Sequence, residues 1–121
     1  MTRTNDDSWE SVFVQWLRLS KLRLNDVVFV LSVSGGNQKK NVSMNIVAAL
    51  KYARSVGSQI VGIVGDDGGF TATVADACVR IPAETQEHIT PHAEAFQAVI
   101  WHLMVSHPAL KREAKEWTAT S

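Results

Sequence analysis

The segment Asp26-Val-Val-Phe-Val-Leu-Ser32 is followed directly by Val33-Ser-Gly-Gly-Asn37, so an apolar run leads into a loop of serines and glycines. The apolar side chains occupy consecutive positions, which predicts a buried strand with helices on both faces of a parallel sheet. A polar stretch and a helix over about 41–56 follow. In open α/β sheets such a loop lies where ligands bind, beyond the carboxyl end of the strand.

Strands and helices alternate along the rest of the chain. We expect a first helix after the N-cap Ser8, strands at 59–64 and 78–81, a short helix around 71–76, and a last helix opened by Pro91 at its first position. The first helix carries the aromatic stripe Trp9, Phe13 and Trp16, which is core or interface, and the last helix is expected to point Phe96, Val99, Ile100 and Leu103 inward. This order predicts an α/β fold, a three-layer parallel sheet with flanking helices.

Composition narrows the classes of function. The 121 residues are enough for one domain, and 12 basic residues cancel 12 acidic ones, which argues against nucleic acid as a partner. The longest apolar run, 27–31, is too short to cross a membrane, and the first ten residues lack a secretory signal. A single cysteine, Cys78, excludes an internal disulfide and fits the cytoplasm.

The loop after the first strand is the main candidate for chemistry. Hydroxyls at Ser32 and Ser34, flexible glycines and a helix start together suit an anion, and Lys39 and Lys40 add positive charge. On this pattern alone, an anion site and a plain polar loop are equally open. The spacing of glycine and lysine matches neither a Walker loop nor a dinucleotide fingerprint.

Three other groups of residues could carry chemistry, but each also has a plain structural interpretation. His88 and His92 are four residues apart with Pro91 between them, and we favour two solvated histidines over a metal pair. Cys78 lies in a strand pattern and is expected in the core. The loop containing Asp66-Asp67 is interpreted as a turn or as a wall on the side of a ligand away from its anionic group, because carboxylates repel anions.

Four segments in register resemble the SIS (sugar isomerase) phosphosugar-binding family, in particular the sedoheptulose 7-phosphate (phosphoheptose) isomerases. They are the strand and serine loop at 26–35, Asn5-Asp6 with the following helix, the glycine and Ala-Asp stretch at 65–82, and the helix ending Ile100-Trp-His102. The resemblance implies a SIS, flavodoxin-like fold that is truncated at its N-terminus. Residues 1–108 are then a partial SIS domain, and 109–121 a charged C-terminal tail.

The resemblance also implies roles for individual residues. The substrate-binding positions are Asn5, Asp6, Ser32, Ser34, Gly35 and, in a loop about two residues longer than usual, Asn37. Asp6 is alternatively a helix cap. Glu94 and His102 take the remaining catalytic or zinc-ligand positions, although eight helical residues separate them by about 12 Å. An ordinary helix histidine is the alternative for His102.

The function implied is phosphosugar binding related to aldose–ketose isomerisation. The segment bearing the family's catalytic glutamate would precede Met1, so we expect no useful isomerase activity from this chain alone. Two alternatives stay open: a non-catalytic module that senses a phosphosugar or scaffolds an assembly, and the later part of a longer enzyme. Zinc is a possible cofactor by resemblance only. Three strands leave sheet edges uncovered, which predicts a homo-oligomer, a dimer or tetramer.

Overall fold

The computed structural model describes residues 9–111, so Ser8, Asn5 and Asp6 lie outside the described residues. The elements are η1 (Trp9–Ser11), α2 (Val12–Leu19), β1 (Val27–Ser32), α3 (Met44–Val56), β2 (Gln59–Val64), α4 (Gly69–Val74), β3 (Ala77–Arg80), η2 (Gln86–His88) and α5 (Ile89–Ser106). This alternation confirms the predicted order of strands and helices.

The three strands form one parallel sheet in the order β1-β2-β3. Val30 on β1 is paired with Gly62 on β2, which is paired in turn with Cys78 on β3. The parallel sheet with flanking helices confirms the predicted fold class. The carboxyl ends of β1 and β2 lie side by side, which places the loops at 33–43 and 65–68 next to each other.

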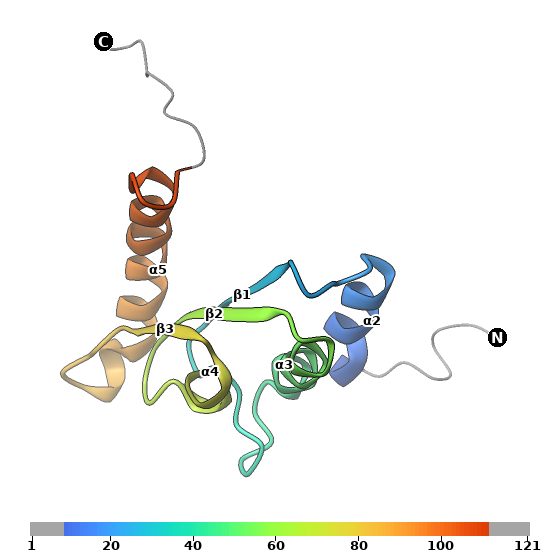
Figure 1. Ribbon diagram of the computed structural model, residues 1–121. Coiled ribbons are helices and arrows are strands. Elements are labelled where there is room, and N and C mark those ends of the chain that lie inside the picture. Colours follow the sequence, from blue (N-terminus) through green and yellow to red (C-terminus); the bar gives the residue numbers. More distant parts are fainter. Residues whose placement is uncertain (1–8, 112–121) are drawn as a thin grey trace.

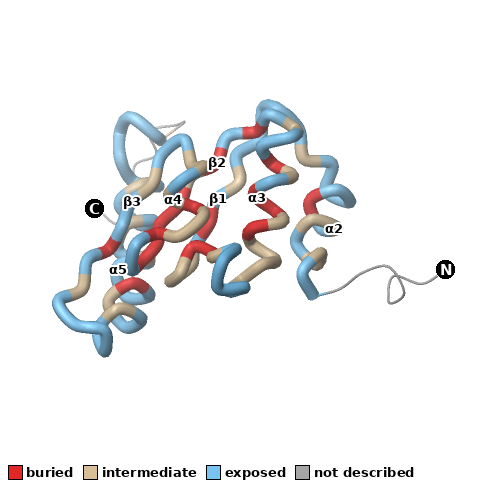
Figure 2. The backbone as a smooth tube through the Cα atoms, turned by 90° about the horizontal axis from the view of Figure 1, so that it is seen from below, coloured by how far each residue is buried: buried red, intermediate tan, exposed pale blue. Residues whose placement is uncertain are grey.

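Helices α3 and α4 lie together on one face of the sheet, and α2 lies beside α3 (Figure 1). The core forms between this layer and the sheet, around Val30, Leu50, Ala53 and Ile60. The opposite face is covered only in part: Ile63 is fully buried, whereas Val27 is half exposed. In Figure 2 the buried positions accordingly follow α3 and β2, while β1 is largely exposed or intermediate.

Two helices begin at other residues than expected. Helix α3 begins at Met44 rather than near residue 41, because Asn41 and Ser43 have left-handed backbone angles that a helix cannot include. Helix α5 begins at Ile89, so Pro91 is its third residue and not its first. Proline is tolerated there because amides in the first turn lack an intrahelical partner.

The prediction that α5 points Phe96, Val99, Ile100 and Leu103 inward is wrong for three of these four residues. Phe96, Val99 and Leu103 are 47%, 49% and 59% exposed, and the helix projects beyond the sheet (Figure 1). Trp9 and Trp16 are also exposed, so this stripe is no part of the core among the described residues, and its role at an interface stays a prediction. Among residues 9–111, no helix is long and apolar enough to cross a membrane.

Candidate functional site

The two loop serines turn their hydroxyl oxygens onto the loop's own backbone. The Gly35 N–H donates to Ser32 Oγ at 2.9 Å, and the Gly36 N–H donates to Ser34 Oγ at 3.2 Å. A hydroxyl that accepts an amide in this way keeps its own hydrogen for another acceptor. The amides of Gly36 and of Gly35, a substrate-binding position by the family resemblance, are therefore used within the loop, and the serine hydroxyls are its available donors.

The loop carbonyls face the start of α4. Gly36 O accepts from the Phe70 N–H at 2.7 Å, and Gly35 O accepts from the Thr71 amide at 3.0 Å and the Thr71 hydroxyl at 2.8 Å. Gly35 has a φ of +74°, and a Cβ there would lie 2.0 Å from Gly68 O. Backbone of one loop therefore contacts backbone of the other, and only glycine fits at this position.

Asn37 closes a short turn beyond the serine loop. Its N–H donates to Val42 O at 2.8 Å and its carbonyl accepts from the Val42 N–H at 2.9 Å, while its side-chain oxygen accepts from the Lys40 N–H at 3.0 Å. The extra residues therefore form a self-contained turn. The Asn37 side-chain oxygen already has a structural partner, so only the amide nitrogen of that group is a candidate donor to a ligand.

A polar hollow of about 360 Å³ lies at the start of α3. It is lined by Trp9, Glu10, Asn41, Ser43, Met44 and Asn45. The Ser43 side chain makes no cap hydrogen bond with the first turn. The Ser43 carbonyl oxygen lies 3.4 Å from where a Cβ on Gly36 would stand, so the hollow adjoins the serine loop. A helix start favours anions, whereas the Glu10 carboxylate on the rim suits hydroxyl groups.

Sequence reasoning missed two residues that hold this region together. The Gln97 side chain donates to Ser32 O at 3.1 Å and to Ile63 O at 2.9 Å, which ties α5 to the ends of β1 and β2. Thr71 is the second such residue. It is fully buried, and its hydroxyl donates to the Gly35 carbonyl oxygen. In the structure Gln97 follows the buried Ala93 by four residues and therefore lies on the inward face of the helix, but the sequence alone does not show that Ala93 is buried.

Glu94 and His102 are both exposed on α5. The helix is continuous from Ile89 to Ser106, so their backbones are separated by about 12 Å of rise. The His102 ring stacks on Trp101 with 3.8 Å between ring centroids. Within residues 9–111 these two side chains do not come together as ligands of one ion, so no zinc-dependent step is derived from them.

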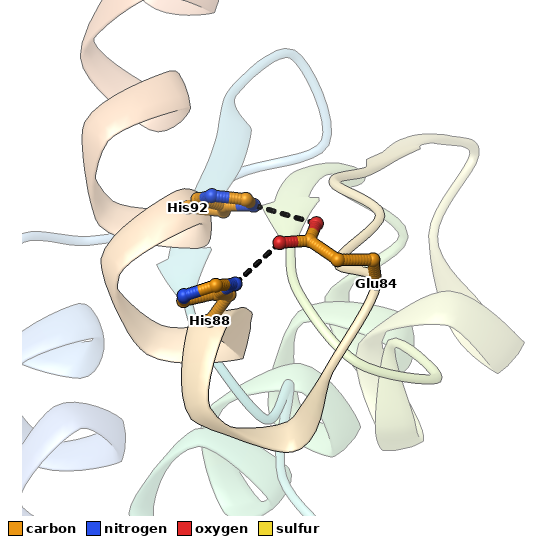
Figure 3. Close-up of polar contacts among 3 residues, drawn as sticks. All are labelled: Glu84, His88 and His92. Atoms are coloured by element: carbon orange, nitrogen blue, oxygen red, sulfur yellow. Dashed lines mark hydrogen bonds and ion pairs between the residues drawn. The ribbon is translucent and has the colours of Figure 1, made fainter.

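A different cluster of polar side chains forms at the start of α5. Glu84 contacts His88 through the ring Nδ1, and its other oxygen lies 3.8 Å from His92 Nδ1 (Figure 3). The His88 and His92 rings are stacked, with centroids 5.2 Å apart. A backbone hydrogen bond at Glu84 and then the His88 contact lower the pKa of the Glu84 carboxyl below its ordinary value. Sequence reasoning missed Glu84, which joins the histidines only because residues 81–88 fold back.

Two further predictions concern the loop after β2 and the cysteine on β3. The loop with Asp66 and Asp67 is a turn, since the Gly68 N–H donates to Gly65 O and the Asp67 carboxylate accepts from the Gly69 N–H at 2.9 Å. Cys78 is only partly buried. Burial raises the pKa of its thiol, and the nearby Arg80 offsets this in part, so the group is no activated nucleophile.

Comparison with known proteins finds a lincomycin biosynthesis protein and several phosphoheptose isomerases among the relatives. No family model matches the chain. A lincomycin biosynthesis protein of Streptomyces lincolnensis is 30% identical over 109 residues, which are 86% of this chain and 38% of that protein. The phosphoheptose isomerase of Rhodospirillum rubrum is 32% identical over 83% of this chain and 47% of its own length. That of Mycobacterium tuberculosis is 34% identical over 82% and 47%.

Solved structures agree with these sequences. Phosphoheptose isomerase from Neisseria gonorrhoeae superposes with a TM-score of 0.63 at 25% identity, over 84% of this chain and 52% of that one. The Francisella tularensis enzyme, at 18% identity and a TM-score of 0.64, supports the fold alone. The chain spans about half the length of the relatives that it matches. Over that span it is a phosphoheptose isomerase-like domain of the SIS family.

Proposed function

We propose that the chain binds the phosphate group of a sugar phosphate at the Ser32–Gly36 loop. The observation that carries the proposal is the pair of hydroxyls on Ser32 and Ser34, which accept from the loop amides and keep their hydrogens for a ligand. They stand at the carboxyl end of β1, where α/β sheets bind ligands. Charge-assisted hydrogen bonds from hydroxyls to phosphate are stronger than neutral ones.

The hollow at the start of α3 would take the sugar. Its wall combines amides of Asn41 and Asn45 with the Glu10 carboxylate, groups that hydrogen-bond to hydroxyls, while the helix start beside Ser43 favours the phosphate end. Asn5 and Asp6, outside the described residues, stay predicted sugar contacts. Relatives named phosphoheptose isomerase favour sedoheptulose 7-phosphate as the first ligand to test.

The wider activity is proposed to be that of an aldose–ketose isomerase domain. Such a reaction needs a base at the carbon next to the carbonyl and an acid at the oxygen. Glu94 and His102 are our candidates, brought to the substrate of a second chain rather than to their own, since both are exposed on the projecting α5. The single cysteine keeps the cytoplasm as the proposed compartment.

Titration calorimetry with sedoheptulose 7-phosphate tests the phosphate site. We expect the double variant Ser32→Ala/Ser34→Ala to lose about 1–3 kcal/mol of binding free energy, because hydrogen bonds to a charged group are removed. The non-phosphorylated sugar should bind weakly to both proteins. Binding of the double variant that equals the unchanged chain would refute the site.

Two controls separate the loss of a ligand contact from a loss of fold. Ser55→Ala removes a hydroxyl that donates to Tyr52 O within α3, and it should leave binding unchanged. Ser32→Thr keeps a hydroxyl at the end of a strand, where a β-branched residue is well tolerated, and should retain most of the affinity. Circular dichroism of each variant establishes that the fold is retained.

A further inference from the structure

The side chains of Glu84, His88 and His92 form a cluster that shares no residue with the serine loop and that the proposed function does not use. Each of the three side chains offers one ligand atom, and these atoms all lie within 4.8 Å of one another. No other group of three such residues is found within 9–111. Figure 3 shows both imidazole rings on one side of the helix start with the carboxylate facing them.

The local structure explains why these groups converge. His88 ends η2 and His92 lies in the first turn of α5, four residues later, so their side chains share one helix face. The connection from β3 returns along this face and brings the Glu84 carboxylate beside the two stacked rings, where it faces both Nδ1 atoms. Because all three side chains are at least partly exposed, their rotamers can adjust without disturbing the core.

We propose that Glu84, His88 and His92 form a site for a divalent transition-metal ion of the zinc class. Two imidazoles and one carboxylate are the donor set that such ions accept, with water completing the coordination. Ligand atoms around tetrahedral zinc lie about 3.3 Å apart, so the cluster needs only small side-chain adjustments: Glu84 and His88 move slightly apart, and His92 moves closer. The bound ion would fasten the segment 81–88 to α5.

This site differs from the residues that the family resemblance suggests. Glu94 follows His92 by two positions, and residues two apart on a helix do not face each other. His102 lies about 15 Å further along the helix than His92. The proposal therefore stands on its own geometry and is independent of phosphosugar binding.

The test is zinc binding by the tag-free chain after chelator treatment. Calorimetry should show one ion per chain, and Co²⁺ should give the visible absorption of a nitrogen- and oxygen-ligated ion. His88→Ala and His92→Ala should each weaken binding by about tenfold or more, and Glu84→Gln, which keeps the size of the side chain, should weaken it similarly.

The remaining histidines, His102 and His107, supply matched controls, because both are exposed on or just after the same helix. His107→Ala should bind zinc as the unchanged chain does, and so should His102→Ala. Loss of binding only in His102→Ala would assign the ion to that residue and overturn the proposal. So would equal affinity of all four histidine variants, or no binding below about 100 μM.

Discussion

Gly35 is the residue on which the serine loop depends most. The chain reverses there with a φ of +74°, and its Cα faces the Gly68 carbonyl so closely that a methyl group would stand 2.0 Å from that oxygen. The carbonyl oxygen of Gly35 also accepts the hydrogen bond from the buried Thr71 hydroxyl. A single position thus sets the spacing between the loops that follow β1 and β2.

We expect Gly35→Ala to lower the free energy of unfolding by about 3 kcal/mol or more, because a positive φ and a backbone clash both oppose the methyl group. Urea unfolding measures this. Gly57→Ala is the matched control: its φ of +88° carries the same conformational penalty, but the nearest atom is a Leu24 methyl at 3.0 Å. That variant should lose only about 1 kcal/mol. Equal losses would mean that the contact with Gly68 is unimportant.

At the scale of elements, one polar side chain links α5 to two strands. Gln97 donates to carbonyls at the ends of both β1 and β2, in a partly buried setting. Ala93 is the buried residue of the helix, and it packs against Gly65 just after β2. The two hydrogen bonds of Gln97 therefore add to this packing in positioning α5 over the strand ends.

Gln97→Ala should lower the free energy of unfolding by about 1–3 kcal/mol, because it leaves two carbonyls without a donor. Hydrogen exchange should also become faster in α5 than in α3. Gln86→Ala, at an exposed position in η2, is expected to change stability by less than about 0.5 kcal/mol. An equal effect of the two substitutions would contradict the role of Gln97.

The sequence predicted the elements better than their contacts. Apolar runs identified the strands, and the serine loop followed β1 as expected. The start of α3 was displaced because Asn41 and Ser43 adopt backbone angles that no periodicity reveals. The face of α5 was misjudged because apolar residues surround most of this helix, so spacing alone does not select the buried side. The buried side contains the small residue Ala93 and the polar residue Gln97, and neither is a residue type that indicates a buried helix face.

The candidate site was predictable to a similar degree. The order of strand, loop and helix drew attention to Ser32 and Ser34, and the family resemblance added Gly35; binding of a ligand by these residues stays a prediction. Which groups face a ligand was not predictable, because the glycine amides are taken by the serine oxygens. The cluster around Glu84 depends on a reversal of the chain in 81–88, and although its residues are close in sequence, this irregular backbone follows no hydrophobic periodicity.

At the scale of the whole molecule, the described residues leave large apolar side chains exposed on several surfaces. These include the open face of the sheet, with Val27, Phe29 and Leu31, the helix α5, with Phe96, Val99 and Leu103, and the aromatic stripe of Trp9, Phe13 and Trp16. Apolar surface of this extent marks an interface more often than free surface. We therefore retain the prediction of a homo-oligomer.

Light scattering at micromolar concentration should give a mass above the 13.3 kDa of one chain. Val99→Asp, on α5, should shift the population towards monomer, because a buried unpaired charge opposes association. Gln38→Asp introduces the same charge in an exposed turn and should leave the mass unchanged. A folded monomer for the unchanged chain would refute the prediction.

The small closed turn between Asn37 and Val42 has a practical consequence for protein engineering. The paired backbones of these two residues form a stem, and residues 38–41 beyond it are exposed. Because a stem fixes both ends of the turn, its tip can grow at a small entropic cost. A fluorescent reporter or an affinity peptide inserted after Lys39 would therefore stand next to the serine loop without stretching it, and would report ligand arrival at close range.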